Sequence, residues 1–152
     1  MPRLKSPKAK GDAYEREIAQ YLSDALGIKA RRAPLSGGGA SFQNYTPGVP
    51  GIGAGLSDIT GAPGLHIECK AVDRLNVHAA LRQAIRSVEW HKSLDLPTVV
   101  TRRNHMKTGA SLVMMRLDDW LVLYAAYLRR TQTEPSPDAS DSPPPDHRPT
   151  GA

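Results

Sequence analysis

The stretch SDITGAPGLHIECK places Asp58, Glu68 and Lys70 in otherwise apolar sequence. If residues 64–70 form a strand, alternation directs Glu68 and Lys70 to one face and Cys69 to the opposite, apolar face. The glycines and proline of the intervening GAPG turn let the preceding segment run back beside this strand, which would bring Asp58 near Glu68. The sequence therefore predicts two carboxylates and an ammonium clustered on a sheet.

Two converging carboxylates repel each other unless a cation lies between them. Because these oxygen ligands occur without a cluster of histidine and cysteine, they favour Mg²⁺ or Mn²⁺ over Zn²⁺. Mg²⁺ needs only one or two protein carboxylates, which Asp58 and Glu68 supply, with the backbone carbonyl of Cys69 as a further ligand. Lys70 is placed to orient or deprotonate a metal-bound water that attacks phosphorus. The predicted chemistry is phosphodiester hydrolysis without a small-molecule cofactor.

A third acid, Glu15, shares one helical side with Ala19 and Leu22 at spacing i, i+4 and i+7. It should therefore lean toward the sheet, while Glu17 points outward. The alternative is an ordinary first-turn carboxylate that the helix dipole stabilises. For the whole cluster the alternative is a solvated cross-strand ion pair, since such a spacing also occurs by chance.

The charge of the chain is unevenly distributed. Residues 131–152 contain six prolines, four acids and one arginine, a composition that predicts a disordered tail. Because the tail carries −3 of a total net charge of +5, residues 1–130 carry +8. A body this basic suggests a polyanionic partner, most simply nucleic acid, although a solvated lysine and arginine surface has the same composition.

Cysteine content and hydropathy favour an intracellular protein. The single cysteine, Cys69, excludes an internal disulfide, and on the apolar side of its strand it is interpreted as a small buried hydrophobe rather than a reactive or metal-binding thiol. No apolar run approaches about 18 residues, and the first residues are polar and basic. We expect a soluble cytoplasmic protein with no membrane contact.

The first third of the chain contains a helix and a long loop. A flexible basic arm is expected over residues 1–10, followed by a helix from an N-cap at Asp12 to Gly27 and a short strand within 28–33. Residues 36–56 contain seven glycines and two prolines, which predicts a long loop. Loops of this length are usually functional or disordered, so this one is a candidate DNA-contacting or lid segment.

After the two strands of the opening stretch, an apolar stripe predicts a helix over residues 77–93. The β-branched TVVT predicts a strand that begins after Pro97, and SLVMM predicts another. A last helix should begin near Asp118 and pack, in the core or at a dimer interface, through Trp120, Leu121, Tyr124 and Leu128. This order predicts one α/β domain over residues 11–130, a mixed sheet flanked by helices.

Arg102, Arg103 and Asn104 directly follow an apolar strand. They should therefore lie at its end, where they can reach a phosphate or the active centre. Arginine recognises phosphate through paired donors, so this group is a candidate DNA contact. The alternative is a solvated turn.

Four segments, KGDAYEREIAQYL, GIKARRAPLSGG, SDITG and LHIECK, occur in this order. Together they resemble the PD-(D/E)XK nuclease superfamily and, within it, the archaeal-type Holliday junction resolvases and their phage relatives. The likeness is strongest over residues 10–72. It implies a restriction-endonuclease-like fold and a homodimer that binds four-way DNA junctions and nicks them with magnesium.

The resemblance also assigns roles to residues. The catalytic and metal-binding set that it implies is Glu15, Asp58, Glu68 and Lys70. Positions that contact DNA or support the site in the family are matched here by Arg16, Arg31 or Arg32, and Ser36. The glutamine often found on the helix after the motif is matched by Gln83.

The chain departs from this pattern in two places. The segment GGASFQNYTPGVPGIGAGL intervenes before the aspartate strand, where compact resolvases have a short connection. Ser57 stands in place of the proline of the superfamily name, which changes a backbone restraint and removes no ligand. Three alternatives stay open: a restriction-like or repair nuclease on duplex or flap DNA, a DNA-binding module that does not cleave, and a basic scaffold in which the cluster is a salt bridge.

Overall fold

The structure, a computed structural model, describes residues 6–33 and 57–133. The predicted loop 36–56, including Ser36, and the tail beyond residue 133 lie outside these ranges.

Five strands form one mixed sheet in the order β1-β2-β3-β4-β5. They are β1 (Arg31–Arg32), β2 (Ile59–Thr60), β3 (Leu65–Ala71), β4 (Leu96–Arg102) and β5 (Leu112–Met114). The central pair, β3 and β4, is parallel and in register from Leu65 opposite Leu96 to Ala71 opposite Arg102, and every other pair is antiparallel. The predicted mixed α/β sheet is confirmed.

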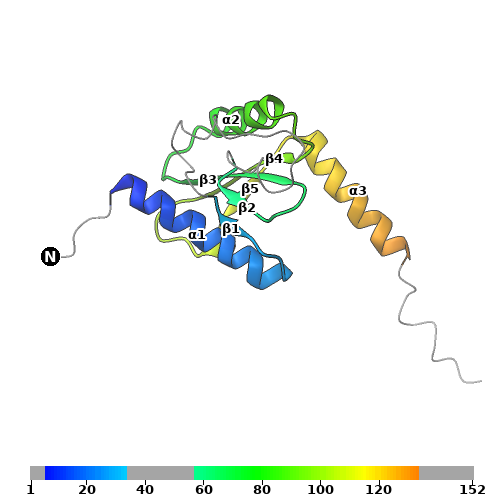
Figure 1. The fold of residues 1–152 in the computed structure, drawn as a ribbon, viewed down its shortest axis with the longest axis horizontal. Helices are drawn as coiled ribbons and strands as arrows, with labels where there is room; N and C mark the ends of the chain where they lie inside the picture. The colour runs from blue at the N-terminus through cyan, green and yellow to red at the C-terminus, as the bar shows by residue number, and fades with distance from the viewer. Residues whose placement is uncertain (1–5, 34–56, 134–152) are drawn as a thin grey trace, which may run out of the picture. The chain divides into compact units, whose positions relative to one another are not determined.

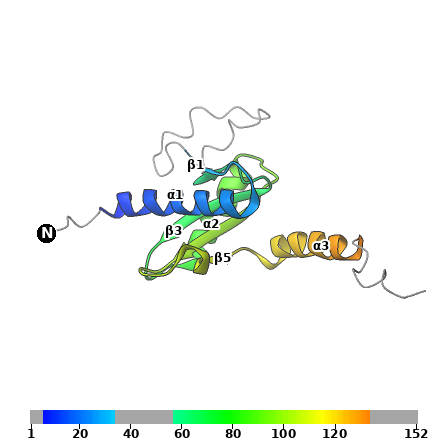
Figure 2. The same cartoon turned by 90° about the horizontal axis from the view of Figure 1, so that it is seen from below.

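Two helices cover opposite faces of the sheet (Figures 1 and 2). α1 (Pro7–Leu26) packs against a cluster that includes Val100, whereas α2 (Val77–Trp90) packs against Val99. Neighbouring residues of a strand point to opposite faces, so the two valines of β4 mark the two sides. The connection from β3 through α2 to β4 is the crossover that a parallel strand pair requires.

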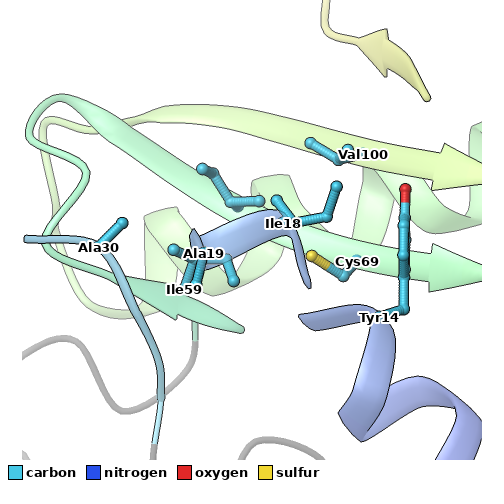
Figure 3. Close-up of a cluster of buried hydrophobic side chains, with 8 residues drawn as sticks. Tyr14, Ile18, Ala19, Ala30, Ile59, Cys69 and Val100 are labelled. Carbon is cyan, nitrogen blue, oxygen red and sulfur yellow. The ribbon is translucent and has the colours of Figure 1, made fainter. Parts of the chain in front are cut away.

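The larger part of the core lies between α1 and the sheet (Figure 3). Tyr14 and Ile18 of α1 pack there against Ile67, Cys69 and Val100. The predicted alternation along β3 is therefore confirmed, with its odd-numbered residues in the core. Burial raises the pKa of the Cys69 thiol, which fits a small buried hydrophobe rather than a reactive thiol.

The predicted start of the first helix is wrong, because α1 begins at Pro7 instead of after Asp12. The Ser6 side chain caps the helix by accepting from the Ala9 N–H at 3.2 Å, and proline is well suited to the first helical position. Residues 7–10, expected to be part of a flexible arm, are thus helical. The predicted end is confirmed, since Gly27 adopts the left-handed conformation with φ 66°.

Smaller differences concern the later elements. β4 begins at Leu96 and includes Pro97, which was expected to precede the strand. Leu96 N–H donates to Gly64 on the β3 side, so the missing N–H of Pro97 falls on the opposite side, and β5 pairs only with Val99 to Thr101. α2 ends at Trp90 rather than at residue 93.

The described chain divides into two compact units, with residues up to Asp119 in the first and Trp120 onward in the second. α3 (Leu117–Thr133) continues past residue 130, so residues 131–133, which were predicted to belong to the tail, are helical. The four side chains predicted to pack are each at least 39% exposed, and the rings of Trp120 and Tyr124 stack with centroids 4.9 Å apart. None of the helices in the described ranges is both long and apolar enough to cross a membrane.

Candidate active site

Asp58 is fixed at the point where β2 meets β3. Its N–H donates to the Ile67 carbonyl at 2.8 Å, and its own carbonyl accepts from the Ala33 N–H at 2.8 Å. Its side-chain Oδ2 accepts from the Cys69 N–H at 2.7 Å. Backbone contacts to both neighbouring segments therefore hold this carboxylate, which is only 8% exposed.

The buried Ser57 hydroxyl extends the pairing of β2 with β3. It accepts from the Ile67 N–H at 2.9 Å and donates to the Ile59 carbonyl at 2.7 Å. A side chain thus takes the place of a ladder hydrogen bond immediately before Asp58. Sequence reasoning noted Ser57 only as a missing proline, and its short polar side chain was the available signal for this role.

Glu68 and Lys70 point to the α2 side of β3, as the alternation predicts. Lys70 Nζ donates to Glu68 Oε2 at 3.4 Å and to Gln83 Oε1 at 3.1 Å, and Gln83 Nε2 donates to Glu68 Oε2 at 3.0 Å. His66 Nε2 lies 3.5 Å from Glu68 Oε1. Gln83 therefore joins the acid and the lysine, and we call Asp58, Glu68, Lys70 and Gln83 the acid cluster.

The acid cluster is strained electrostatically. Burial, together with the nearby charges of Glu68 and Glu15, raises the pKa of Asp58 to about 7, although the hydrogen bond from the Cys69 N–H and the charge of Lys70 oppose the rise. Lys70 therefore does not fully compensate the two buried acids. A site with surplus buried negative charge is one that gains from an added cation.

Glu15 reaches the neighbourhood of the cluster from α1 and is 8% exposed, which agrees with the predicted inward orientation. Its Oε2 accepts from Arg32 Nε at 2.6 Å, and the same guanidinium donates to Asp12 Oδ1 at 2.7 Å. Arg32, predicted as a DNA contact, is thus engaged with two carboxylates of α1. Asp12, expected as a helix cap, instead helps to hold Arg32.

The donor set fits a cation held by few protein ligands. Within residues 6–33 and 57–133, no group of three or more histidine, cysteine or acidic side chains is arranged to hold a metal ion. Asp58 and Glu68 interact as a pair, and Mg²⁺ needs only one or two carboxylates because it retains several waters. The Cys69 carbonyl points to the same edge of β3 as its N–H, and therefore toward Asp58.

The remaining residues that were predicted to contact DNA lie outside the acid cluster, on α1, on β1 and at the end of β4. Arg16 and Arg31 are exposed on α1 and β1. Arg102 is held by Glu17, with Nη2 to Oε2 at 2.6 Å, whereas Arg103 and Asn104 are exposed beyond the end of β4. The structure brings Asp58, Glu68, Lys70 and Gln83 together and leaves these other residues outside the cluster.

A mixed sheet with an aspartate directly before one strand, Glu-x-Lys on the next and a helix on each face defines a restriction-endonuclease-like domain. Residues 6–132 match the model of a family described as "Phage putative PDDEXK endonuclease". The chain belongs to this family, which confirms the PD-(D/E)XK superfamily predicted from its motifs. Membership of a PD-(D/E)XK endonuclease family supports a nuclease activity. Neither the curated proteins nor the solved structures contain a match to the chain.

Proposed function

We propose that this protein is a divalent-metal-dependent endonuclease that hydrolyses phosphodiester bonds in DNA at the acid cluster. The observation that carries the proposal is the buried pair Asp58 and Glu68, in which Glu68 contacts Lys70 both directly and through Gln83. Asp58, Glu68 and the Cys69 carbonyl would hold Mg²⁺, or Mn²⁺, and Glu15 would add a charge nearby. When bound, the metal lowers the pKa of a water and stabilises charge on the phosphate.

The other groups of the acid cluster prepare the site. Lys70 has one face toward Glu68 and a side chain that is 26% exposed, so its ammonium can meet a water or a phosphate oxygen that enters from solvent. Gln83 holds the Lys70 ammonium by accepting a hydrogen bond from it, and it holds the Glu68 carboxylate by donating a hydrogen bond to it. Lys70 would therefore orient the attacking water and compensate charge as the phosphate gains a bond.

We further propose branched DNA, and a four-way junction in particular, as the substrate of a homodimer. The resemblance of four ordered motifs to junction resolvases supports this, and so does the charge of +8 on residues 1–130. Arg16, Arg31 and Ser36 are proposed DNA contacts on the same basis. Restriction-like or flap cleavage is the alternative to be separated by experiment.

The test is cleavage of an end-labelled four-way junction and a linear duplex of matched sequence, in Mg²⁺ and in EDTA. Asp58→Asn keeps the size of the side chain and removes its charge, while Asp24→Asn makes the same change at an exposed position near the end of α1. We expect Mg²⁺-dependent cutting by the wild type and Asp24→Asn and none by Asp58→Asn. Cutting that persists in Asp58→Asn would overturn the proposed site.

The two substrates decide the specificity. Symmetric nicking of the junction alone supports the resolvase, and equal cutting of both substrates identifies a general endonuclease with the same metal site. Tight binding without cutting of either substrate would leave a DNA-binding module.

A further inference from the structure

A cavity of about 360 Å³ opens at the far end of β3 and β4, where Ala71 directly follows Lys70 of the acid cluster on β3. Its walls come from α1, from the ends of both strands and from the turn after β4. Four cationic side chains and one carboxylate line it, namely Lys10, Arg102, Arg103, Lys107 and Glu17. We call this cavity the basic pocket.

The turn after β4, which forms one wall of the basic pocket, is held by hydrogen bonds to α1 and to the segment after β3. Asn104 accepts from Lys10 Nζ of α1, and its N–H donates to Asp73 Oδ1 at 2.9 Å, on the segment after β3. The Asn104 side chain also donates to the other oxygen of Asp73. These contacts join three segments that are distant in sequence, so the pocket is preformed.

Arg102 is built into the wall of the basic pocket. One nitrogen lies 2.6 Å from Glu17 Oε2, another donates to Thr108 Oγ1 at 3.2 Å, and the guanidinium lies 4.6 Å from the centre of the Tyr14 ring. Arg103 and Lys107 are exposed, and no described carboxylate bonds to either of them. These two side chains are therefore the cations available to a ligand.

From these contacts we propose that the basic pocket binds a backbone phosphate of the DNA substrate, within about three nucleotides of the phosphate that is cleaved. This inference rests on the proposed nuclease function and adds a second anion site to it. Ala71 lines the pocket and lies three residues beyond Glu68. That separation is about 10 Å along a strand, and successive phosphates of one DNA strand advance about 3.4 Å along the helix axis, so the bound phosphate should lie no more than about three nucleotides from the cleaved bond.

The chemistry of the pocket favours a phosphodiester over other anions. A phosphodiester has a single charge and two free oxygens, which a guanidinium contacts through paired donors while an ammonium contacts either oxygen. Arg103 and Lys107 provide one of each. Glu17 reduces the total positive charge, so the pocket suits one phosphate within a longer polyanion.

The test measures binding of fluorescently labelled duplex and junction DNA in EDTA by anisotropy, over a range of salt concentrations. We expect Arg103→Ala/Lys107→Ala to weaken binding about tenfold or more and to reduce the slope of log affinity against log salt by about 1 to 2. Lys29→Ala is the control, because Lys29 is exposed and lies beside the turn at the opposite end of β3. Unfolding midpoints of all three proteins should agree, since the changed side chains are exposed.

Neutral methylphosphonates, placed at one DNA position at a time, locate the phosphate. The wild type should lose affinity most at one position within about three nucleotides of the cleaved bond, and the double variant should be insensitive there. Equal affinity and salt slope in the double variant and Lys29→Ala would overturn the pocket.

Cleavage in Mg²⁺ is measured separately, so failure of the proposed function can be distinguished from failure of this inference. A wild type that binds through the pocket without cleaving rejects the nuclease and keeps the pocket. A wild type that cleaves while the double variant binds like Lys29→Ala rejects only the pocket. Absence of DNA binding by the wild type rejects both.

Discussion

The acid cluster and the basic pocket share strand β3 and are built in opposite ways. Asp58 and Glu68 are 8% and 3% exposed, and backbone and side-chain donors fix their oxygens. Arg103 and Lys107 of the basic pocket are exposed to solvent. Buried charge costs folding free energy unless it is compensated, whereas solvated charge costs little.

This difference separates the expected effects of substitution. Changes in the acid cluster should alter catalysis and stability together, because the same groups are buried and reactive. Changes in the basic pocket should alter affinity for a polyanion and leave stability nearly constant. The following predictions test that separation, beginning with the largest effect.

Replacing Lys70 of the acid cluster and Lys107 of the basic pocket by methionine, one at a time, should affect different kinetic constants. We expect Lys70→Met to lower the cleavage rate at saturating DNA by about 10²- to 10⁴-fold, because the group that orients water and compensates charge is lost. Lys107→Met should lower kcat/KM mainly through a higher KM. Single-turnover cleavage across a range of protein concentrations measures both, with Lys29→Met as the control. A Lys70→Met protein with normal kcat would contradict the assignment.

Ser57→Ala removes the hydroxyl that replaces a ladder hydrogen bond beside Asp58. The buried Ile67 N–H would lose its acceptor, which should cost about 1 to 3 kcal/mol of the free energy of unfolding. Urea denaturation measures the loss, and Ser87→Ala on α2 serves as the control. A cost no larger than that of the control would show that the hydroxyl does not support the strand pair.

Divalent metal should stabilise the protein through the acid cluster alone. At about ten times its dissociation constant, Mg²⁺ should add about 1.4 kcal/mol to the free energy of unfolding, which raises the unfolding midpoint by several degrees. Asp58→Asn should abolish the shift and, in EDTA, unfold at a higher temperature than the wild type, because one of two repelling acids is neutral. The Arg103→Ala/Lys107→Ala protein should respond to Mg²⁺ like the wild type.

The acid cluster could be predicted because its information is local. Glu68 and Lys70 lie on β3, and Asp58 directly precedes β2, which one turn joins to β3, so alternation and a tight turn suffice to place them. The resemblance to known nucleases added Gln83, whose contact with Glu68 crosses from a helix to a strand. The helix start at Ser6 and Pro7 was missed although a serine cap followed by proline is a strong local signal.

The basic pocket could not be predicted in full for a physical reason. Arg103 and Asn104 were recognised at a strand end, but the pocket also needs Lys10, which is joined to Asn104 across 94 residues of sequence. Such a contact depends on how α1 packs on the sheet, and neither periodicity nor spacing reports that packing. Glu17 was correctly expected to point outward, yet its partner Arg102 could not be identified from the sequence.

The smallest expected effect concerns Glu17, the only carboxylate that lines the basic pocket within the described residues. Glu17→Gln should change the free energy of unfolding by less than about 1 kcal/mol, since its ion pair with Arg102 is 46% exposed on the Glu17 side and solvent screens it. DNA affinity should rise about threefold, because the pocket becomes more positive. Glu89→Gln removes an exposed acid of α2 and controls for net charge. If Glu17→Gln and Glu89→Gln raise DNA affinity equally, the effect belongs to overall charge. If only Glu17→Gln raises DNA affinity, and does not raise it in the Arg103→Ala/Lys107→Ala background, the effect belongs to the basic pocket.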